Sequence, residues 1–89
     1  MIHLNIIVRG TVQGVYFRKC TNEKANELGL KGYVMNRIDG TVYVEVEGEE
    51  EVVNQFKEWL HEGSPKSTVF AVEPREGKVQ GFDQFEIRR

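Results

Sequence analysis

The sequence predicts an α+β fold in which two helices cover one face of a β-sheet. Several segments have apolar residues at every second position, as strands do, and two segments have them every three or four positions, as helices do. Their order along the chain is strand, helix, strand, strand, helix, strand. This order is typical of a split βαβ, or ferredoxin-like, sandwich with an antiparallel sheet.

The first half of the chain predicts a strand, a helix and a hairpin. Gly29 follows the helical pattern and can end a helix in the left-handed conformation. Asp39-Gly40 lies between two alternating runs and is a strong hairpin signal. The expected elements are strands at 3–9, 33–37 and 41–47 and a helix at 17–28. The buried face of this helix is expected to contain Phe17, Cys20, Thr21, Ala25 and Leu28.

The second half predicts another helix and two strands. The helix begins at Glu49-Glu50-Glu51, where acidic side chains favour the helix dipole, and stops at Gly63-Ser64-Pro65. Its buried stripe is expected to be Val52, Phe56, Trp59 and Leu60. The expected strands are 68–73 and 82–88, with a polar connection at 76–81 and with Phe85 and Ile87 facing the core.

The composition fits one small globular domain spanning residues 1–89. The chain has 89 residues, of which 39% are hydrophobic and 29% charged, enough for a single core. A net charge of −2, from 12 basic and 14 acidic residues, provides no broad cationic surface for nucleic acid or a membrane. Because there is one cysteine, no signal-peptide pattern and no long apolar run, we expect a cytoplasmic protein. We also expect a monomer.

The segment from Gly10 to Arg18 connects the first strand to the first helix and is expected to bind an anion. The first N–H groups of a helix have no intrahelical partner and lie at the positive end of its dipole. Gly10 and Gly14 permit the positive φ values that a cradle of amides requires. Arg18 opposes the dipole by about 0.3–1 kcal/mol, which a bound phosphate would offset. The alternative is an ordinary tight turn with a surface arginine.

Two motifs resemble the signatures of the acylphosphatase family. The run from Gly10 to Arg18, Gly-Thr-Val-Gln-Gly-Val-Tyr-Phe-Arg, resembles the first signature. The second signature is matched by Gly32-Tyr33-Val34-Met35-Asn36, Gly40, Val42 and Gly48. The resemblance spans essentially the whole chain. It implies the same sandwich with a short additional C-terminal strand, and hydrolysis of the carboxyl-phosphate bond of acyl phosphates without metal or cofactor.

The resemblance also implies roles for individual residues. Arg18 would bind the phosphate of the substrate, and Asn36 would orient the attacking water. The expected substrate-binding residues are Gln13, Gly14, Val15, Tyr16, Phe17 and Arg18, with phosphate or sulfate as an anion ligand. The topology brings Asn36 to the same sheet edge as the loop, about 10 Å away, but leaves open which sheet face it occupies. A carboxylate can leave without protonation, so this chemistry needs no general acid.

Other interpretations fit the same sandwich. One is a noncatalytic anion-binding or RNA-contacting module, although the chain lacks an aromatic RNP signature and a basic face. Another is a domain that binds carbamoyl phosphate within a maturation factor, although the chain ends with the domain, which favours a free-standing enzyme.

Cys20 can be a packed or a reactive thiol, and Tyr16 can flank the acyl group or shield the loop. We expect His3 and His61 on the surface, and the acidic run 47–51 in solvent.

Overall fold

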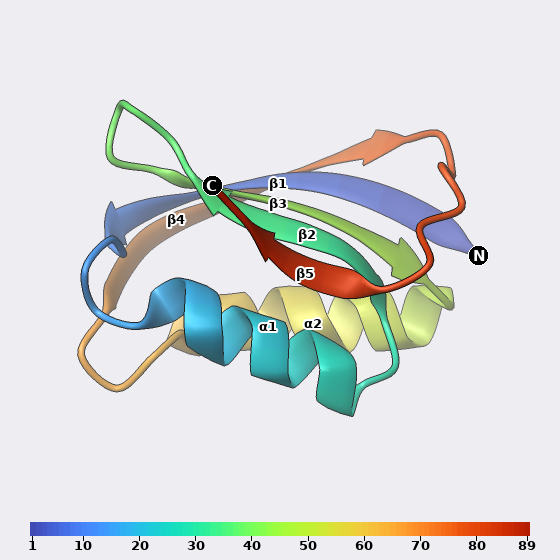
Figure 1. Ribbon diagram of the computed structural model, residues 1–89, viewed down its shortest axis with the longest axis horizontal. Helices are drawn as coiled ribbons and strands as arrows, with labels where there is room; N and C mark the ends of the chain where they lie inside the picture. The colour runs from blue at the N-terminus through green and yellow to red at the C-terminus, as the bar shows by residue number, and fades with distance from the viewer.

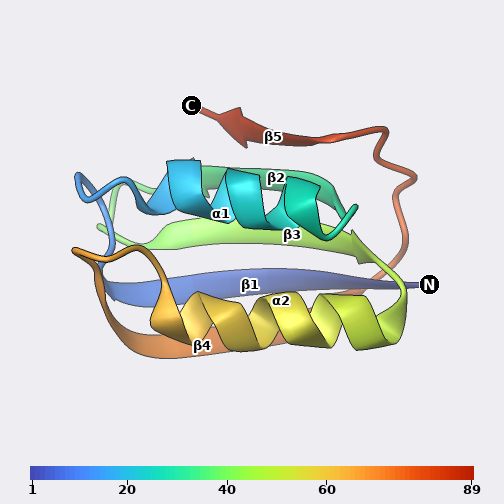
Figure 2. The same ribbon diagram turned by 90° about the horizontal axis from the view of Figure 1, so that it is seen from below.

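The computed structural model describes residues 1–89 as two layers, a sheet and a pair of helices (Figure 1). The strand order in the sheet is β4-β1-β3-β2-β5, and both helices lie on one face of it (Figure 2). The predicted ferredoxin-like sandwich with an additional C-terminal strand is therefore confirmed. The elements are β1 (Ile2–Thr11), α1 (Phe17–Glu27), β2 (Lys31–Asn36), β3 (Val42–Gly48), α2 (Glu50–Glu62), β4 (Thr68–Gly77) and β5 (Phe85–Arg88).

The sheet is antiparallel except where β5 pairs with β2. Strand β3 lies between β1 and β2 and runs antiparallel to both, so β1 and β2 end at the same edge of the sheet. Strand β4 ends beside the start of β1, where His3 pairs with Gly77. A strand that begins from that end of the sheet runs in the same direction as β2, which explains the parallel pairing of β5.

Strand β4 is longer than predicted because backbone pairing with β1 continues beyond the alternating segment. Residues 76 and 77, expected in a polar connection, still pair with β1. The register of this pair shifts between Arg9 and Gly10, where the strand has a bulge. Gly10 has φ 141°, and a Cβ there would lie 2.1 Å from the backbone oxygen of Thr68. Only glycine fits this bulge, which leads β1 into the following loop.

The core lies between the helices and one face of the sheet. Leu4, Ile6 and Val8 of β1 all point into it. In α2, Val53 is fully buried whereas Val52 and Trp59 are only partly buried, so the predicted stripe is wrong by one position at its start. The side chains that the two helices bury completely are Phe17, Thr21, Ala25, Val53, Phe56 and Leu60.

The opposite face of the sheet has no helix, and the segment 78–84 packs over part of it. His3 is only 2% exposed there, and so is Glu47. The prediction of a surface His3 is therefore wrong, because Phe82 stacks on its ring at 6.0 Å between centroids. The expectation that Glu47 lies in solvent is also wrong, since its carboxylate anchors this segment. His61 is exposed, as predicted.

Glu47 binds three consecutive backbone N–H groups. Gly81 and Phe82 donate to one carboxylate oxygen at 2.9 and 3.1 Å, and Gln80 donates to the other. The Nδ1 atom of His3 lies 2.7 Å from the same carboxylate. We call this group of residues, together with Asn5 and Glu45, the open-face cluster. It ties the connection before β5 to the middle of the sheet.

Candidate active site

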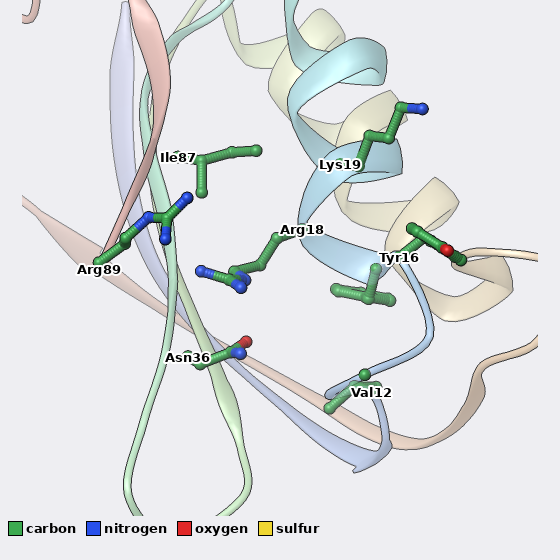
Figure 3. Close-up of a pocket in the computed structure, with 9 residues that line it drawn as sticks. Val12, Tyr16, Arg18, Lys19, Asn36, Ile87 and Arg89 are labelled. Carbon is green, nitrogen blue, oxygen red and sulfur yellow. The ribbon is translucent and has the colours of Figure 1, made fainter.

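A pocket of about 390 Å³ lies where β1 ends and α1 begins (Figure 3). The end of β2 and the last residues of the chain form its other walls. No acidic side chain contributes to the lining. The lining residues are Val12, Gly14, Tyr16, Phe17, Arg18, Lys19, Asn36, Ile87 and Arg89.

The start of α1 presents unpaired hydrogen-bond donors to this pocket. Tyr16 precedes the helix with φ 60° and provides no side-chain cap, and the first turn contains no acidic residue. The backbone N–H groups of residues 13–18 donate no hydrogen bond within the protein. Because these donors lie at the positive end of the helix dipole, the loop can receive an anion. Gly14, with φ 75°, has the positive φ expected of it.

Arg18 and Asn36 face each other across the pocket. In Figure 3 the guanidinium of Arg18 points toward the carboxamide of Asn36. Arg18 forms no ion pair and no side-chain hydrogen bond, although five such ion pairs occur elsewhere in the chain. The Oδ1 atom of Asn36 is buried and also has no partner. Two polar groups without partners in one pocket are available to bind a polar ligand.

The register of β2 decides which sheet face Asn36 occupies, the question that the sequence left open. Strand β2 pairs regularly with β3 from Lys31 to Asn36, which lies opposite Val42. Asn36 is two residues beyond the fully buried Val34 and therefore shares its face, the one covered by the helices. The turn begins only after Asn36, at Arg37. The carboxamide consequently points to the side on which α1 starts.

Two side chains hold the loop in place from outside the pocket. The Nε2 atom of Gln13 donates to the backbone oxygens of Arg37 and Thr41 at 2.8 and 2.9 Å. The hydroxyl of the buried Ser64 donates to the backbone oxygen of Val15 at 2.7 Å. Gln13 and Val15 are not part of the pocket lining, whereas the other four predicted substrate-binding residues are.

The sequence patterns did not indicate Ser64, Ile87 or Arg89 at this site. Ile87 alternates with Arg88 and so lies on the expected face, but it is 40% exposed at the pocket and is not a core residue. Lys19 lines the pocket with its backbone end, while its amino group points away (Figure 3). Cys20 is partly buried and lies outside the lining.

No group of three or more His, Cys, Asp or Glu side chains is placed to hold a metal ion. Neither helix has the length and apolar character needed to span a bilayer.

The structure thus defines a ferredoxin-like α+β sandwich with one pocket built from helix-start amides, an arginine and a carboxamide. The family model described as Acylphosphatase matches residues 4–87. The chain belongs to the acylphosphatase family.

Individual relatives agree with this assignment, two of them over nearly their full length. An acylphosphatase of Archaeoglobus fulgidus is 44% identical over 87 residues, covering 98% of both chains. The crystal structure of an acylphosphatase from Bacillus subtilis superposes with a TM-score of 0.98 at 38% identity, covering 100% of both. The structure of full-length HypF in its phosphate- and nucleotide-bound form matches this whole chain with a TM-score of 0.86 and 32% identity, but the match covers 12% of that chain.

Proposed function

We propose that Arg18, Asn36 and the backbone amides of residues 13–18 perform the reaction of this hydrolase. The enzyme cleaves the carboxyl-phosphate bond of acyl phosphates and yields a carboxylate and inorganic phosphate. The observation that carries the assignment of residues is the convergence of unpaired N–H groups, an unpaired guanidinium and an unpaired carboxamide on one pocket without acidic side chains.

The phosphoryl group is held by the loop and by Arg18. A guanidinium can donate two parallel hydrogen bonds to two phosphoryl oxygens, while the loop amides donate to the remaining one. The loop amides are held in place before the substrate binds, because α1 and the contacts of Gln13 and Ser64 hold the loop. Such preorganised donors stabilise the charge that spreads over the phosphoryl oxygens in the transition state. Inorganic phosphate and sulfate should occupy the same cradle.

Asn36 positions the attacking water. A carboxamide is not a base at neutral pH, so it acts by hydrogen bonding to the water and not by removing its proton. The water oxygen forms a bond to phosphorus while the bond from phosphorus to the acyl oxygen breaks, and that electron pair leaves with the carboxylate. The water proton passes to a phosphoryl oxygen of the substrate. No general acid is needed because a carboxylate is a stable leaving group, and alkyl phosphate monoesters should therefore be poor substrates.

A paired assay tests these roles. Phosphate release from benzoyl phosphate is measured in the presence of a chelator for the wild type, Arg18→Ala, Asn36→Ala and the control Arg75→Ala, whose side chain lies on β4 outside the pocket. Both pocket variants should lose at least about a hundredfold in kcat/KM, the size expected for a lost oxyanion donor. Inhibition by inorganic phosphate should weaken in Arg18→Ala and persist in Asn36→Ala.

Two results would contradict the assignment. Equal phosphate affinity in the wild type and in Arg18→Ala would remove the arginine from phosphate binding. Tight phosphate binding by the wild type without any turnover would instead favour the noncatalytic anion-binding module. The match to 12% of full-length HypF shows that a domain similar to this chain occurs within a larger protein.

We further propose that residues 1–89 form one domain that acts as a cytoplasmic monomer. One continuous cluster of 15 buried apolar residues supports the single domain. The lone Cys20 is compatible with a reducing compartment. Light scattering across a range of protein concentrations would test the monomer, and a mass that doubles with concentration would overturn it.

A further inference from the structure

The pocket contains a second arginine that the phosphoryl group does not require. Arg89 lines the same pocket as Arg18, and its guanidinium points inward beside Ile87 (Figure 3). Like Arg18, it forms no ion pair and no side-chain hydrogen bond within the chain. Two unpaired guanidinium groups therefore face a pocket in which no acidic side chain offsets their charge.

The neighbouring Arg88 shows what an arginine in this strand does when it has partners. Its Nε atom donates to Glu86 at 2.8 Å, and its guanidinium carbon lies 4.0 Å from the centroid of the Tyr33 ring on the opposite face of the sheet. Both interactions are common for exposed arginines. Arg89 has neither, although it is only one residue away. Arg89 is exposed one residue beyond the end of β5, and its guanidinium is free to bind a ligand.

Arg89 lies in the part of the pocket where the acyl group of the substrate is expected. The phosphoryl group occupies the cradle formed by the loop, so the rest of the substrate extends from the cradle into the remaining space. In Figure 3, Ile87 and Arg89 lie on the far side of Arg18 from Val12 and Tyr16 of the loop. They also lie on the far side of Arg18 from Asn36. Because the attacking water and the leaving oxygen are roughly in line through phosphorus, the acyl group points away from Asn36.

We propose that Arg89 binds an anionic group on the acyl part of the substrate, so that the preferred substrates are acyl phosphates whose acyl chain carries a second negative charge. Ile87 provides an apolar contact for the chain between the two charged ends. The proposal rests on the proposed function, since it assumes that Arg18 and the loop hold the phosphoryl group. The pocket volume of about 390 Å³ is within the usual range for small-molecule sites and is larger than a phosphoryl group alone requires.

The experiment compares three aryl substrates that differ in one substituent. These are benzoyl phosphate, 4-carboxybenzoyl phosphate and 4-carbamoylbenzoyl phosphate, of which the last has nearly the shape of the second but no charge. The wild type should show a higher kcat/KM for the carboxylate than for the amide. In Arg89→Gln this preference should fall about tenfold, the effect of one charge-assisted hydrogen bond in a partly exposed site. Arg89→Lys should retain part of the preference.

Arg88→Gln is the matched control, because it removes the same charge one residue away on the other face of the sheet. It should leave the carboxylate-to-amide ratio unchanged. An equal loss for all three substrates in Arg89→Gln, or no loss for any, would overturn the role of Arg89 while leaving the proposed function intact. The proposed function is tested separately from the role of Arg89, because wild-type activity on benzoyl phosphate should disappear in Arg18→Ala. A wild type that hydrolyses none of the three would overturn both.

Discussion

Arg18 is placed where it costs stability and where the pocket needs it. It lies in the first turn of a helix that has no side-chain cap and no acidic residue near its start. Its charge therefore faces the positive end of the helix dipole without compensation from a neighbouring carboxylate. Tyr16, just before the helix, adopts a left-handed conformation that is unfavourable for a non-glycine residue. The loop thus concentrates local strain at the residues that surround the proposed anion.

Removing the Arg18 charge should stabilise the protein that has no ligand. We expect Arg18→Ala to raise the free energy of unfolding by about 0.3–1 kcal/mol, because the unfavourable interaction with the helix dipole disappears. Urea denaturation in a buffer free of phosphate and sulfate measures this change. Adding phosphate should then stabilise the wild type more than Arg18→Ala, which binds phosphate more weakly.

Lys24→Ala is the control for that experiment. Lys24 lies in the last turn of the same helix, where a cation favours the dipole, and pairs with Glu27 at 3.3 Å. Its removal should lower stability by a few tenths of a kcal/mol. A loss of stability in Arg18→Ala without phosphate would contradict this account of the helix start.

For single residues, the sequence indicated which side chains could bind a ligand but not where in the fold each of them points. The glycines, Arg18 and Asn36 were predicted together because each has an unusual residue type for its position or belongs to a family signature. Asn36 could not be assigned to a face, since a shift of one residue in the hairpin reverses it. Arg89 could not be predicted, because its place depends on the long-range pairing of β5 with β2.

Among the elements, β5 depends most on tertiary contacts. It is a short strand at the edge of the sheet, and its alternating pattern extends over only Phe85 to Arg88. The preceding segment is held by Glu47, a residue whose place in an acidic run suggested exposure. Because the hydrogen bonds of Glu47 reach residues 80–82, more than 30 positions away in the sequence, no local pattern indicated this anchor. The helices and the other strands, which have longer periodic patterns, were predicted to within a few residues.

Replacing the anchoring carboxylate should loosen the segment before β5. In Glu47→Gln one carboxylate oxygen becomes an NH₂ group, which cannot accept a hydrogen bond. Either the backbone N–H groups of Gly81 and Phe82 or those of Gln80 and the His3 ring then lose their acceptor. We expect a loss of about 2–4 kcal/mol in the free energy of unfolding, since buried donors are left without a partner. Hydrogen exchange of the amides of residues 80–82 should become faster.

Glu49→Gln serves as the comparison, because Glu49 is exposed two residues further along the chain. It should change stability by less than about 0.5 kcal/mol. Unchanged exchange rates at residues 80–82 in Glu47→Gln would show that the carboxylate does not hold the segment.

The molecule as a whole buries ions only on the face of the sheet that the helices leave open. The helix-covered face is apolar apart from the pocket edge, whereas the open-face cluster contains an imidazole and two carboxylates. Both ring nitrogens of His3 lie close to acceptors, with Nδ1 2.7 Å from Glu47 and Nε2 2.8 and 3.0 Å from Asn5 and Glu45. A histidine between such acceptors is favoured in its protonated form.

Two opposite pKa shifts follow from this geometry. Burial alone would lower the pKa of His3, but the hydrogen bonds to Glu47 and Asn5 and the charges of Glu45 and Glu47 outweigh it and raise the pKa. Burial alone would raise the pKa of Glu47, but the hydrogen bonds from the Gln80 backbone, His3 and the Phe82 and Gly81 backbone outweigh it and lower the pKa. Burial and a hydrogen bond to Glu45 raise the pKa of Tyr43 to about 12, so this hydroxyl stays protonated.

These shifts predict a maximum of stability in mildly acidic solution. The raised pKa of His3 contributes stability that is complete below its ordinary pKa of 6.5 and is lost as the pH rises through the folded-state value. The lowered pKa of Glu47 contributes stability that is complete above its ordinary pKa of 4.5 and is lost as the pH falls through the folded-state value. Both contributions are complete together only between these two ordinary values, and urea denaturation from pH 4 to 9 should show the maximum there.

His3→Gln should abolish the decline on the alkaline side, and NMR titration should show the raised pKa of His3 directly. His61→Gln should keep that decline, because His61 is exposed; an equal decline in His3→Gln would mean that groups outside the open-face cluster set the alkaline limit.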